Sequence, residues 1–298
     1  MGLGLVLGLL FFVDVDAVLD RLKDVQPGWL GVAALALVAA TLLGAFSLHL
    51  LLDSPQRPPL LRFIPMFWLA WAIGLVVPGQ IGDVATIATG LRRRGYEWHT
   101  AIGRNLVDKG VSLAVIAICA LSGLFLWLDR GPALRILAVV LVLGTLTGIG
   151  LGRLVGLAQG RNYGPLQRLA GFVGDVVAEV GYAARHYPQR ILINLVLTAI
   201  KFGLIASAYG AALRSLGGGA IAMGDLVTIV AASSLAAYIP LSPNGLGTAE
   251  AVGIALFGHI GVPQAAVLAA YLILRALVMG LAWMPVGLWF LSTTLRRA

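Results

Sequence analysis

The sequence predicts an all-α integral membrane protein with about six full transmembrane helices and two re-entrant, broken-helix hairpins arranged as inverted repeats. The first observation is composition, with 59% hydrophobic and 11% charged residues and a mean hydropathy of +0.94. A soluble domain has roughly a quarter of its residues charged. The second is the length of the apolar runs, which exceeds that of membrane-barrel strands. The third is a Pro/Gly break that occurs in two such runs, "VVPGQIGDVATIATGLRRRG" and "YIPLSPNGLGTAEAVGIALFGHIG".

The 298 residues leave no room for a large soluble domain beside these runs, so we expect one polytopic membrane domain over residues 1–298. The net charge of +8 does not indicate a nucleic-acid partner, because the basic residues lie between apolar runs, where they orient the chain and meet anionic lipid. Cys119 is the only cysteine, which excludes a disulfide within the chain. The four histidines lack metal-ligand spacing and no catalytic motif is present, so we expect no enzyme activity, metal or cofactor.

Met1 to Val13 is apolar and predicts a short or truncated first span, because at ~1.5 Å per residue it covers less than the ~30 Å hydrocarbon core. The "DVD" tripeptide at Asp14 to Asp16 lies in a loop with Asp20, Arg21, Lys23 and Asp24, and we interpret it as a solvated turn. Five further runs approach or exceed the ~20 residues needed to cross. They are Trp29 to Leu52, Asn105 to Leu128, Ala133 to Leu157, Ile191 to Leu213 and Gln264 to Leu291.

Two marginal apolar runs, Leu61 to Val77 and Met223 to Ile239, lead into the Pro/Gly breaks. Short apolar helices follow at Asp83 to Arg94 and Thr248 to Ile260, each about 12 residues or ~18 Å long, too short to cross alone. Two arrangements fit this pattern. Each pair returns to the side it entered from as a re-entrant hairpin, or each first half spans while its second half lies on the surface.

Positive-charge bias favours the re-entrant arrangement. We expect the membrane to be the inner (plasma) membrane. With both termini cytoplasmic and each hairpin returning, most of the arginines fall on the cytoplasmic side. An odd number of spans then separates the hairpins, so they open to opposite faces, as in transporters built from inverted repeats. The pseudo-repeats are about residues 29–128 and 191–295, joined by a span and a cytoplasmic amphipathic helix at 165–186.

The breaks are the strongest candidate for a functional site. Backbone at membrane depth must be satisfied by protein or water, and a half-helix N-terminus with its free N–H groups suits an anion. Asp83 and Glu250 lie in the first turns of the two half-helices. Their structural role would be to stabilise the helix dipole. Their functional role would be to pair with a cation such as Lys109 or Arg275, or to carry a proton.

Charged residues within spans are costly and usually face a partner or a cavity. Arg275 and Lys201 lie deep in their runs, and Lys201 has a stem long enough to reach water. Arg104 lies close enough to the end of its run to snorkel. The predicted substrate-binding residues, with no catalytic residue or metal ligand among them, are Gly79, Gly82, Asp83, Arg104, Asp108, Lys109, Lys201, Asn244, Gly245, Gly247, Glu250 and Arg275.

These motifs resemble the transmembrane region of lysylphosphatidylglycerol synthases, a flippase-like membrane family, from about Trp29 to the end of the chain. The family pattern is P-G-x-x-G-[ED], an acidic-basic pair opening the next span, S-P-G-G-x-G-x-x-E, and an arginine in the last long span. It matches Pro78, Gly79, Gly82, Asp83, Ser242, Pro243, Gly245, Gly247, Glu250 and Arg275. Asp108-Lys109 stands where Glu-Arg is more usual, and Asn244 replaces a glycine.

The resemblance implies a flippase or scramblase for an anionic phospholipid, a polyprenyl-phosphate or a glycolipid headgroup. In the synthases a soluble aminoacyl-transferase domain follows the membrane region. We expect no lysyl transfer here, because the 298 residues leave no room for such a domain. A lysine at position 109 binds phosphate as a point charge, whereas arginine offers a bidentate fork. Two alternatives remain open, a membrane-embedded lipid-modifying enzyme and a non-catalytic partner of a cell-envelope enzyme. A homodimer is also compatible with the sequence.

Overall fold

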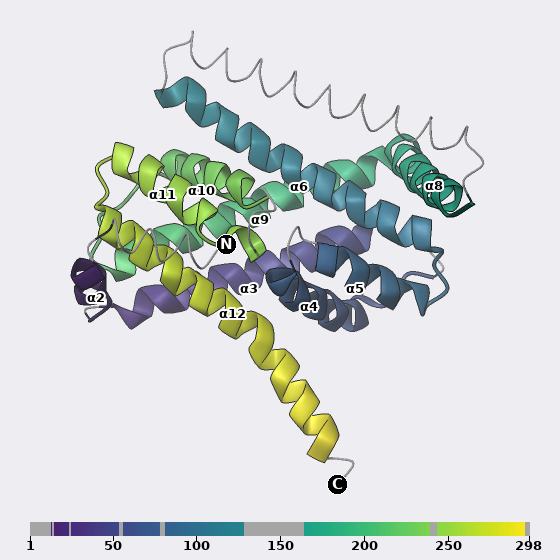
Figure 1. The fold of residues 1–298 in the computed structure, drawn as a ribbon, viewed down its shortest axis with the longest axis horizontal. Helices are drawn as coiled ribbons and strands as arrows, with labels where there is room; N and C mark the ends of the chain where they lie inside the picture. Colours follow the sequence, from purple (N-terminus) through teal and green to yellow (C-terminus); the bar gives the residue numbers. More distant parts are fainter. Residues whose placement is uncertain are drawn as a thin grey trace.

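The computed structural model describes residues 13, 15–23, 25–53, 56–77, 81–127, 164–238 and 243–295, which form helices joined by loops (Figure 1). Four of these helices are long and apolar enough to cross a membrane: Pro27–Leu50, Trp98–Gly123, Pro188–Ser215 and Gln264–Leu288. They lie in α3 (Pro27–Leu50), α6 (Trp98–Trp127), α9 (Pro188–Ser215) and α12 (Gln264–Leu295). Four of the predicted spans are therefore confirmed, and those at Met1 to Val13 and Ala133 to Leu157 lie outside the described residues.

Helices α3 and α9 lie side by side in antiparallel directions, and contacts at both ends fix their register. The Gln26 backbone N–H donates to the Ser215 carbonyl at 2.8 Å. At the opposite end, Arg190 donates to the Asp53 carboxylate at 3.3 Å. Both helices begin with a proline, where the missing N–H costs nothing. These contacts define a Ser215 end and an Asp53 end of the bundle.

Helices α4 (Leu60–Val76) and α5 (Ile81–Arg92) form a pair that starts and finishes at the Asp53 end. Before α4, the His49 ring hydrogen-bonds to the Pro58 carbonyl at 2.7 Å. After α5, the Tyr96 hydroxyl donates to the Asp53 carbonyl at 2.8 Å. The helix boundaries lie within two residues of the prediction, and the intervening 78–80 lie outside the described residues.

Helices α10 (Met223–Tyr238) and α11 (Thr248–His259) form the second pair. This pair follows α9, which ends at Ser215, and precedes α12 in the chain. Figure 1 shows the pair at the opposite side of the bundle from α4 and α5. A short 3₁₀ turn at Pro243–Gly245 precedes α11. Small residues allow close packing here, because a Cβ on Gly245 would lie 2.3 Å from the Ala237 Cα.

Two features differ from the prediction. Residues 15–23 form helix α2 (Val15–Lys23) where a solvated turn was predicted, and Asp16 lies in its first turn. An ion pair between Lys23 and Asp20 lies within this helix. A hydrogen bond from Arg21 to the Leu216 carbonyl holds the helix at the Ser215 end. Helix α6 starts at Trp98, well before Asn105, so that Arg104 is an internal residue of the helix.

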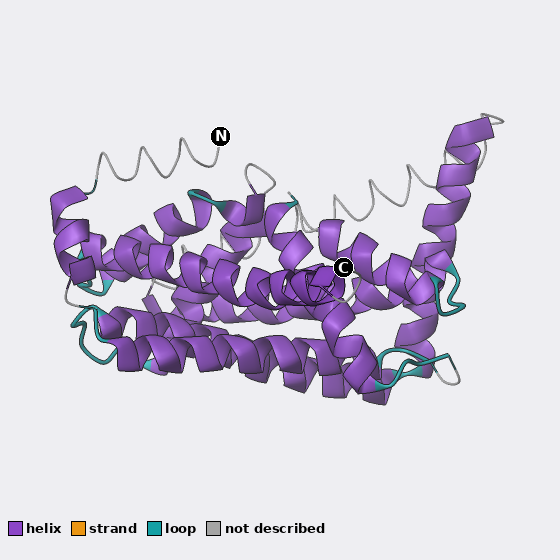
Figure 2. Cartoon of the chain, turned by 90° about the horizontal axis from the view of Figure 1, so that it is seen from below, coloured by secondary structure: helices purple, strands orange, loops and turns teal. Residues whose placement is uncertain are grey.

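Helix α8 (Gly164–His186) confirms the helix predicted at 165–186. It runs across the Asp53 end, while most other helices follow the long axis (Figures 1 and 2). Close contact with α6 depends on Gly103, where a Cβ would lie 2.7 Å from the Glu179 side chain. Val177 and Tyr182 remain exposed on α8, beside the exposed charged residues Asp175 and Arg185.

Candidate functional site

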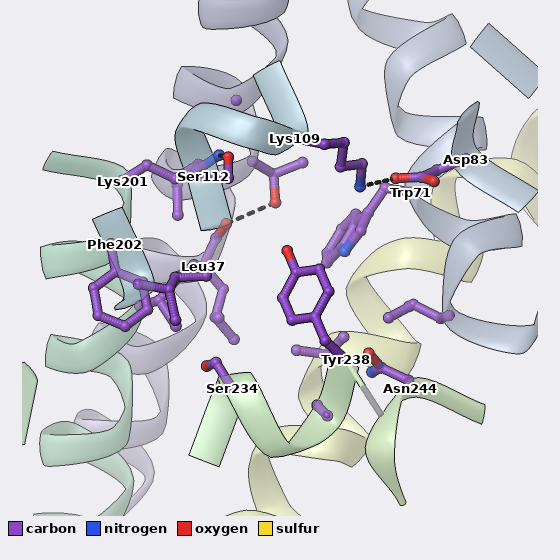
Figure 3. A pocket seen from close by; sticks show the side chains of 18 of the residues that line it. Leu37, Trp71, Asp83, Lys109, Ser112, Lys201, Phe202, Ser234, Tyr238 and Asn244 are labelled. Carbon is purple, nitrogen blue, oxygen red and sulfur yellow. Dashed lines mark hydrogen bonds and ion pairs between the residues drawn. The ribbon is translucent and has the colours of Figure 1, made fainter. Parts of the chain in front are cut away.

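A cavity of about 500 Å³ occupies the middle of the bundle. It is lined from α3, α4, α5, α6, α9, α10, α11 and α12 and from residues that precede α11. Asp83 contributes from the first turn of α5, and Ala249 from the first turn of α11. Figure 3 shows Trp71 and Tyr238 between the Asp83 side and the Asn244 side of this space. The two half-helices therefore begin at the same cavity.

The first half-helix carries a carboxylate–cation pair at the cavity wall. The Lys109 ammonium, from α6, donates a short hydrogen bond to the Asp83 carboxylate. Asp83 Oδ1 also accepts the Val84 N–H at 2.7 Å, which is consistent with a carboxylate at a helix N-terminus. The side chains of Asp83 and Lys109 are 17% and 26% exposed, so both reach the cavity.

The second half-helix carries the matching pair. Arg275, from α12, donates through Nε to Glu250, whose side chain is completely buried. The other Glu250 oxygen accepts the Gly247 N–H at 2.7 Å and so caps α11. Gly247 has a φ of 89°, which favours glycine. The Arg275 side chain is 24% exposed and lines the cavity, with both terminal nitrogens 3.4 Å from the Asn244 carbonyl oxygen.

The wall between α3, α6 and α9 supplies a second group of polar side chains. Asp108 is buried and accepts a hydrogen bond from the Asn194 amide at 2.7 Å. The Asn194 amide also lies 2.6 Å from the Ser47 hydroxyl. One turn further along α6, Ser112 accepts a hydrogen bond from Lys201 at 3.2 Å. Among the described carboxylates, none forms an ion pair with Lys201.

Positive and negative side chains balance around the cavity. Lys109, Lys201 and Arg275 provide the cations, and Asp83, Asp108 and Glu250 provide the carboxylates. The attraction for an anion therefore comes from the two half-helix N-termini and from Lys201, which forms no ion pair with a carboxylate of the described residues. Because Asp83 and Glu250 hold their cations close, an anion in the cavity would have to share those cations with the carboxylates.

The structure places the predicted site residues in several different surroundings. Six line the cavity: Asp83, Asp108, Lys109, Lys201, Asn244 and Arg275. Gly245, Gly247 and Glu250 build the second break behind it, whereas Gly82 is buried in α5, where a Cβ would lie 2.9 Å from Val77. Gly79 lies outside the described residues.

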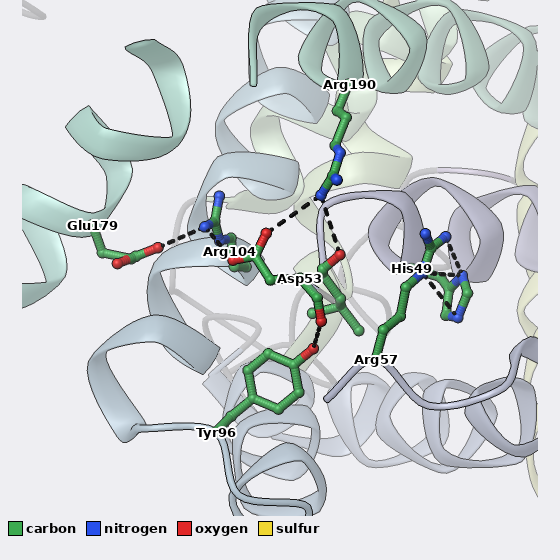
Figure 4. Close-up of polar contacts among 8 residues, drawn as sticks. His49, Asp53, Arg57, Tyr96, Arg104, Glu179 and Arg190 are labelled. Carbon is green, nitrogen blue, oxygen red and sulfur yellow. Dashed lines mark hydrogen bonds and ion pairs between the residues drawn. The ribbon is translucent and has the colours of Figure 1, made fainter. Parts of the chain in front are cut away.

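Arg104 belongs to a different cluster at the Asp53 end (Figure 4). Instead of reaching water by snorkelling, its side chain is 2% exposed and forms ion pairs with Asp53 at 2.6 Å and Glu179 at 3.0 Å. The Tyr187 ring packs against the guanidinium groups of Arg104 and Arg190. Arg104 therefore fastens α8 to the bundle rather than lining the cavity.

The same cluster holds Tyr96 outside the membrane-spanning helices. Its hydroxyl donates to the Asp53 carbonyl at 2.8 Å. Burial, reinforced by the nearby Asp53 carboxylate, raises the pKa of Tyr96 to about 12. Tyr96 is therefore held as a neutral hydrogen-bond donor.

Sequence reasoning missed several lining residues, namely Thr198, Trp71 and Tyr238, and also Asn194, which does not line the cavity but hydrogen-bonds to the lining residue Asp108. Asn194 and Thr198 precede Lys201 on one face of α9, at the spacing of successive helical turns, and both are buried. That polar stripe in an apolar run was a usable signal. Trp71 and Tyr238 gave no such signal, because aromatic residues are ordinary members of apolar helices.

A family model described as "Lysylphosphatidylglycerol synthase TM region" matches residues 1–286. The chain belongs to this family. As a member of the lysylphosphatidylglycerol synthase transmembrane family, it is a membrane protein connected with lipid and cell-envelope metabolism. A comparison with curated proteins gave no match.

Proposed function

We propose that this chain is a flippase- or scramblase-like transporter that moves an anionic or phosphate-bearing lipid headgroup across the membrane. The observation that carries this proposal is the convergence of two half-helix N-termini, each with a carboxylate–cation pair, on one central cavity. Such breaks are typical of transporter sites, where free N–H groups and cations meet an anionic group. Family membership supports a lipid as the substrate.

In this proposal α4–α5 and α10–α11 are re-entrant hairpins of two inverted pseudo-repeats, at about 29–128 and 191–295. The contacts of His49 and Tyr96 at one end, and the position of α10–α11 at the other, support this arrangement. The Asp53 end is cytoplasmic, because the run Arg92–Arg94 and Arg190 lie there, and the membrane is the inner membrane.

The headgroup phosphate binds Lys201 and the exposed donors of Arg275 and Lys109. The lipid tails stay in the bilayer while the headgroup crosses the cavity. No covalent step is needed, so we propose no enzyme activity. Movement is downhill or coupled to an ion.

The proposal is tested by reconstituting the protein with fluorescent phosphatidylglycerol or phosphatidylcholine and following loss of accessible probe at the outer leaflet. Wild-type protein should move the anionic probe faster than empty vesicles do. Lys201→Met should slow it on the order of ten-fold or more, since a charge-assisted contact contributes roughly 1.5–3 kcal/mol. Arg62→Met, which changes an exposed α4 arginine outside the cavity lining, is the control.

Probe movement at the empty-vesicle rate with folded wild-type protein would overturn lipid transport for these headgroups. A wild-type rate for the Lys201→Met variant would overturn the assignment of the headgroup to the cavity.

A further inference from the structure

A second cavity, of about 1260 Å³, lies outside the central one, between α4, α5 and α12. Its apolar floor includes Trp68, Leu69 and Met66 from α4 and Pro285 and Val286 from α12. Thr86 and Thr89 from α5 border it. We call this space the outer groove. A long apolar groove on a membrane helix pair suits an acyl chain.

One end of the outer groove is strongly basic. Arg93 and Arg94 line it, and both are exposed. Within the described part of the chain neither forms an ion pair, whereas the adjacent Arg92 pairs with Glu97 at 3.5 Å. Arg93 and Arg94 therefore offer uncompensated positive charge at the mouth of an apolar groove.

The dimensions of the groove match one leaflet. It extends along α5 from Arg93 back to Ala85, eight residues or about 12 Å at the rise of an α-helix. Half of the hydrocarbon core is about 15 Å thick. A phospholipid whose phosphate lies at Arg93 and Arg94 would thus extend its chain to the level of the break before α5.

The outer groove and the central cavity share one wall. Ala72, Leu75 and Ala282 form a fully packed seam between α4 and α12. Trp68 faces the groove and Trp71 faces the cavity, and their rings meet edge to face at 5.5 Å. A side-chain hydrogen bond from Trp68 Nε1 to the Leu281 carbonyl at 3.1 Å adds to this seam. One layer of side chains separates the two spaces.

We propose that the outer groove binds an anionic phospholipid, with its phosphate on Arg93 and Arg94 and an acyl chain over Trp68 and Pro285. Resting on the proposed function, this lipid is the one that supplies the central cavity when the α4–α12 seam opens. Charge distinguishes this occupant from a second copy of the chain, since the groove mouth carries two arginines without a carboxylate.

The experiment uses the full-length protein in nanodiscs that contain brominated phosphatidylglycerol or brominated phosphatidylcholine with the same chains. The fluorescence of Trp68 is isolated by difference from a Trp68→Phe variant. Half-quenching should need a mole fraction of brominated phosphatidylglycerol on the order of ten-fold lower than that of brominated phosphatidylcholine, since each basic residue near lipid contributes about 1 kcal/mol. High salt should shrink this preference.

An Arg93→Gln/Arg94→Gln double variant should lose the preference for the anionic lipid, and Arg92→Gln should keep it. Equal quenching by both lipids in wild-type protein would overturn the groove site, as would a preference that survives the double variant. In the transport assay the double variant should lose rate at low anionic lipid content and recover it at high content.

The two proposals fail separately. A Trp68 preference for anionic lipid in a protein that moves no lipid would overturn transport and leave the groove site standing. Transport of anionic lipid by a protein whose Trp68 shows no such preference would overturn the groove site and leave the transport proposal standing.

Discussion

Arg275 on α12 donates a hydrogen bond to Glu250 in the first turn of α11, 25 residues earlier in the chain. In the other half, Lys109 donates to Asp83, 26 residues earlier and again in the first turn of a half-helix. Each pair ties a half-helix to the long helix that follows it. The two breaks are thus built on one plan, in which the negative member stabilises the helix N-terminus and the positive member faces the cavity.

Arg275→Met should destabilise the protein by about 3–5 kcal/mol, because it leaves the buried Glu250 without its partner. Adding Glu250→Gln should recover most of this loss, since the amide is neutral and still accepts the Gly247 N–H. Thermal unfolding in detergent measures both changes. If the single variant unfolds at the wild-type temperature, Glu250 does not depend on Arg275 for stability.

The glycines of α11 give a second, packing-based prediction. A Cβ on Gly253 would lie 2.2 Å from the Tyr271 hydroxyl and 2.4 Å from the ring carbon that carries it, whereas nothing lies within 4 Å of a Cβ on Gly258. Gly253→Ala should therefore destabilise by about 1–3 kcal/mol through overpacking. Gly258→Ala in the same helix should be neutral or slightly stabilising. Thermal unfolding compares the two, and equal effects would mean that α11 does not pack on α12 through Gly253.

The orientation of the hairpins gives a third prediction. Glu97 follows α5 and Gly258 lies in the last turn of α11, and both are exposed. In a Cys119→Ser background, single cysteines at these positions should react with a membrane-impermeant thiol reagent from opposite faces of a vesicle. Labelling of both cysteines from one face would be incompatible with hairpins that enter from opposite sides.

Hydropathy and Pro/Gly punctuation were sufficient to predict both half-helices within two residues, because these features are local. The described long helices were also predicted within a few residues, except for the start of α6. The pairing partners of Asp83 and Glu250 were foreseen only as options, since a sequence does not fix distances between helices. The prediction that Arg104 reaches water by snorkelling was wrong for the same reason. Its carboxylate partners, Asp53 and Glu179, are distant in the chain and come together only when α8 crosses the bundle end.

Helix α2 shows a different limit. Its residues Asp16, Asp20, Arg21 and Lys23 have the composition of a solvated turn. Helical spacing instead places Lys23 beside Asp20, and Arg21 reaches the Leu216 carbonyl. The outer groove lay beyond sequence reasoning altogether, because it depends on the angle at which α12 leaves α4 and α5.

Tyr96 gives a prediction about pH. Its pKa is about 12 in the folded protein and ordinarily about 10, so folding favours the protonated hydroxyl. This contribution to stability is complete below pH 10 and is lost as the pH rises through 12. The thermal unfolding temperature of wild-type protein should therefore fall over this interval. Tyr96→Phe, which also lacks the hydrogen bond to Asp53, should unfold at a lower temperature at neutral pH and show a smaller fall between pH 10 and 12. An identical fall in both proteins would show that Tyr96 is not the titrating group.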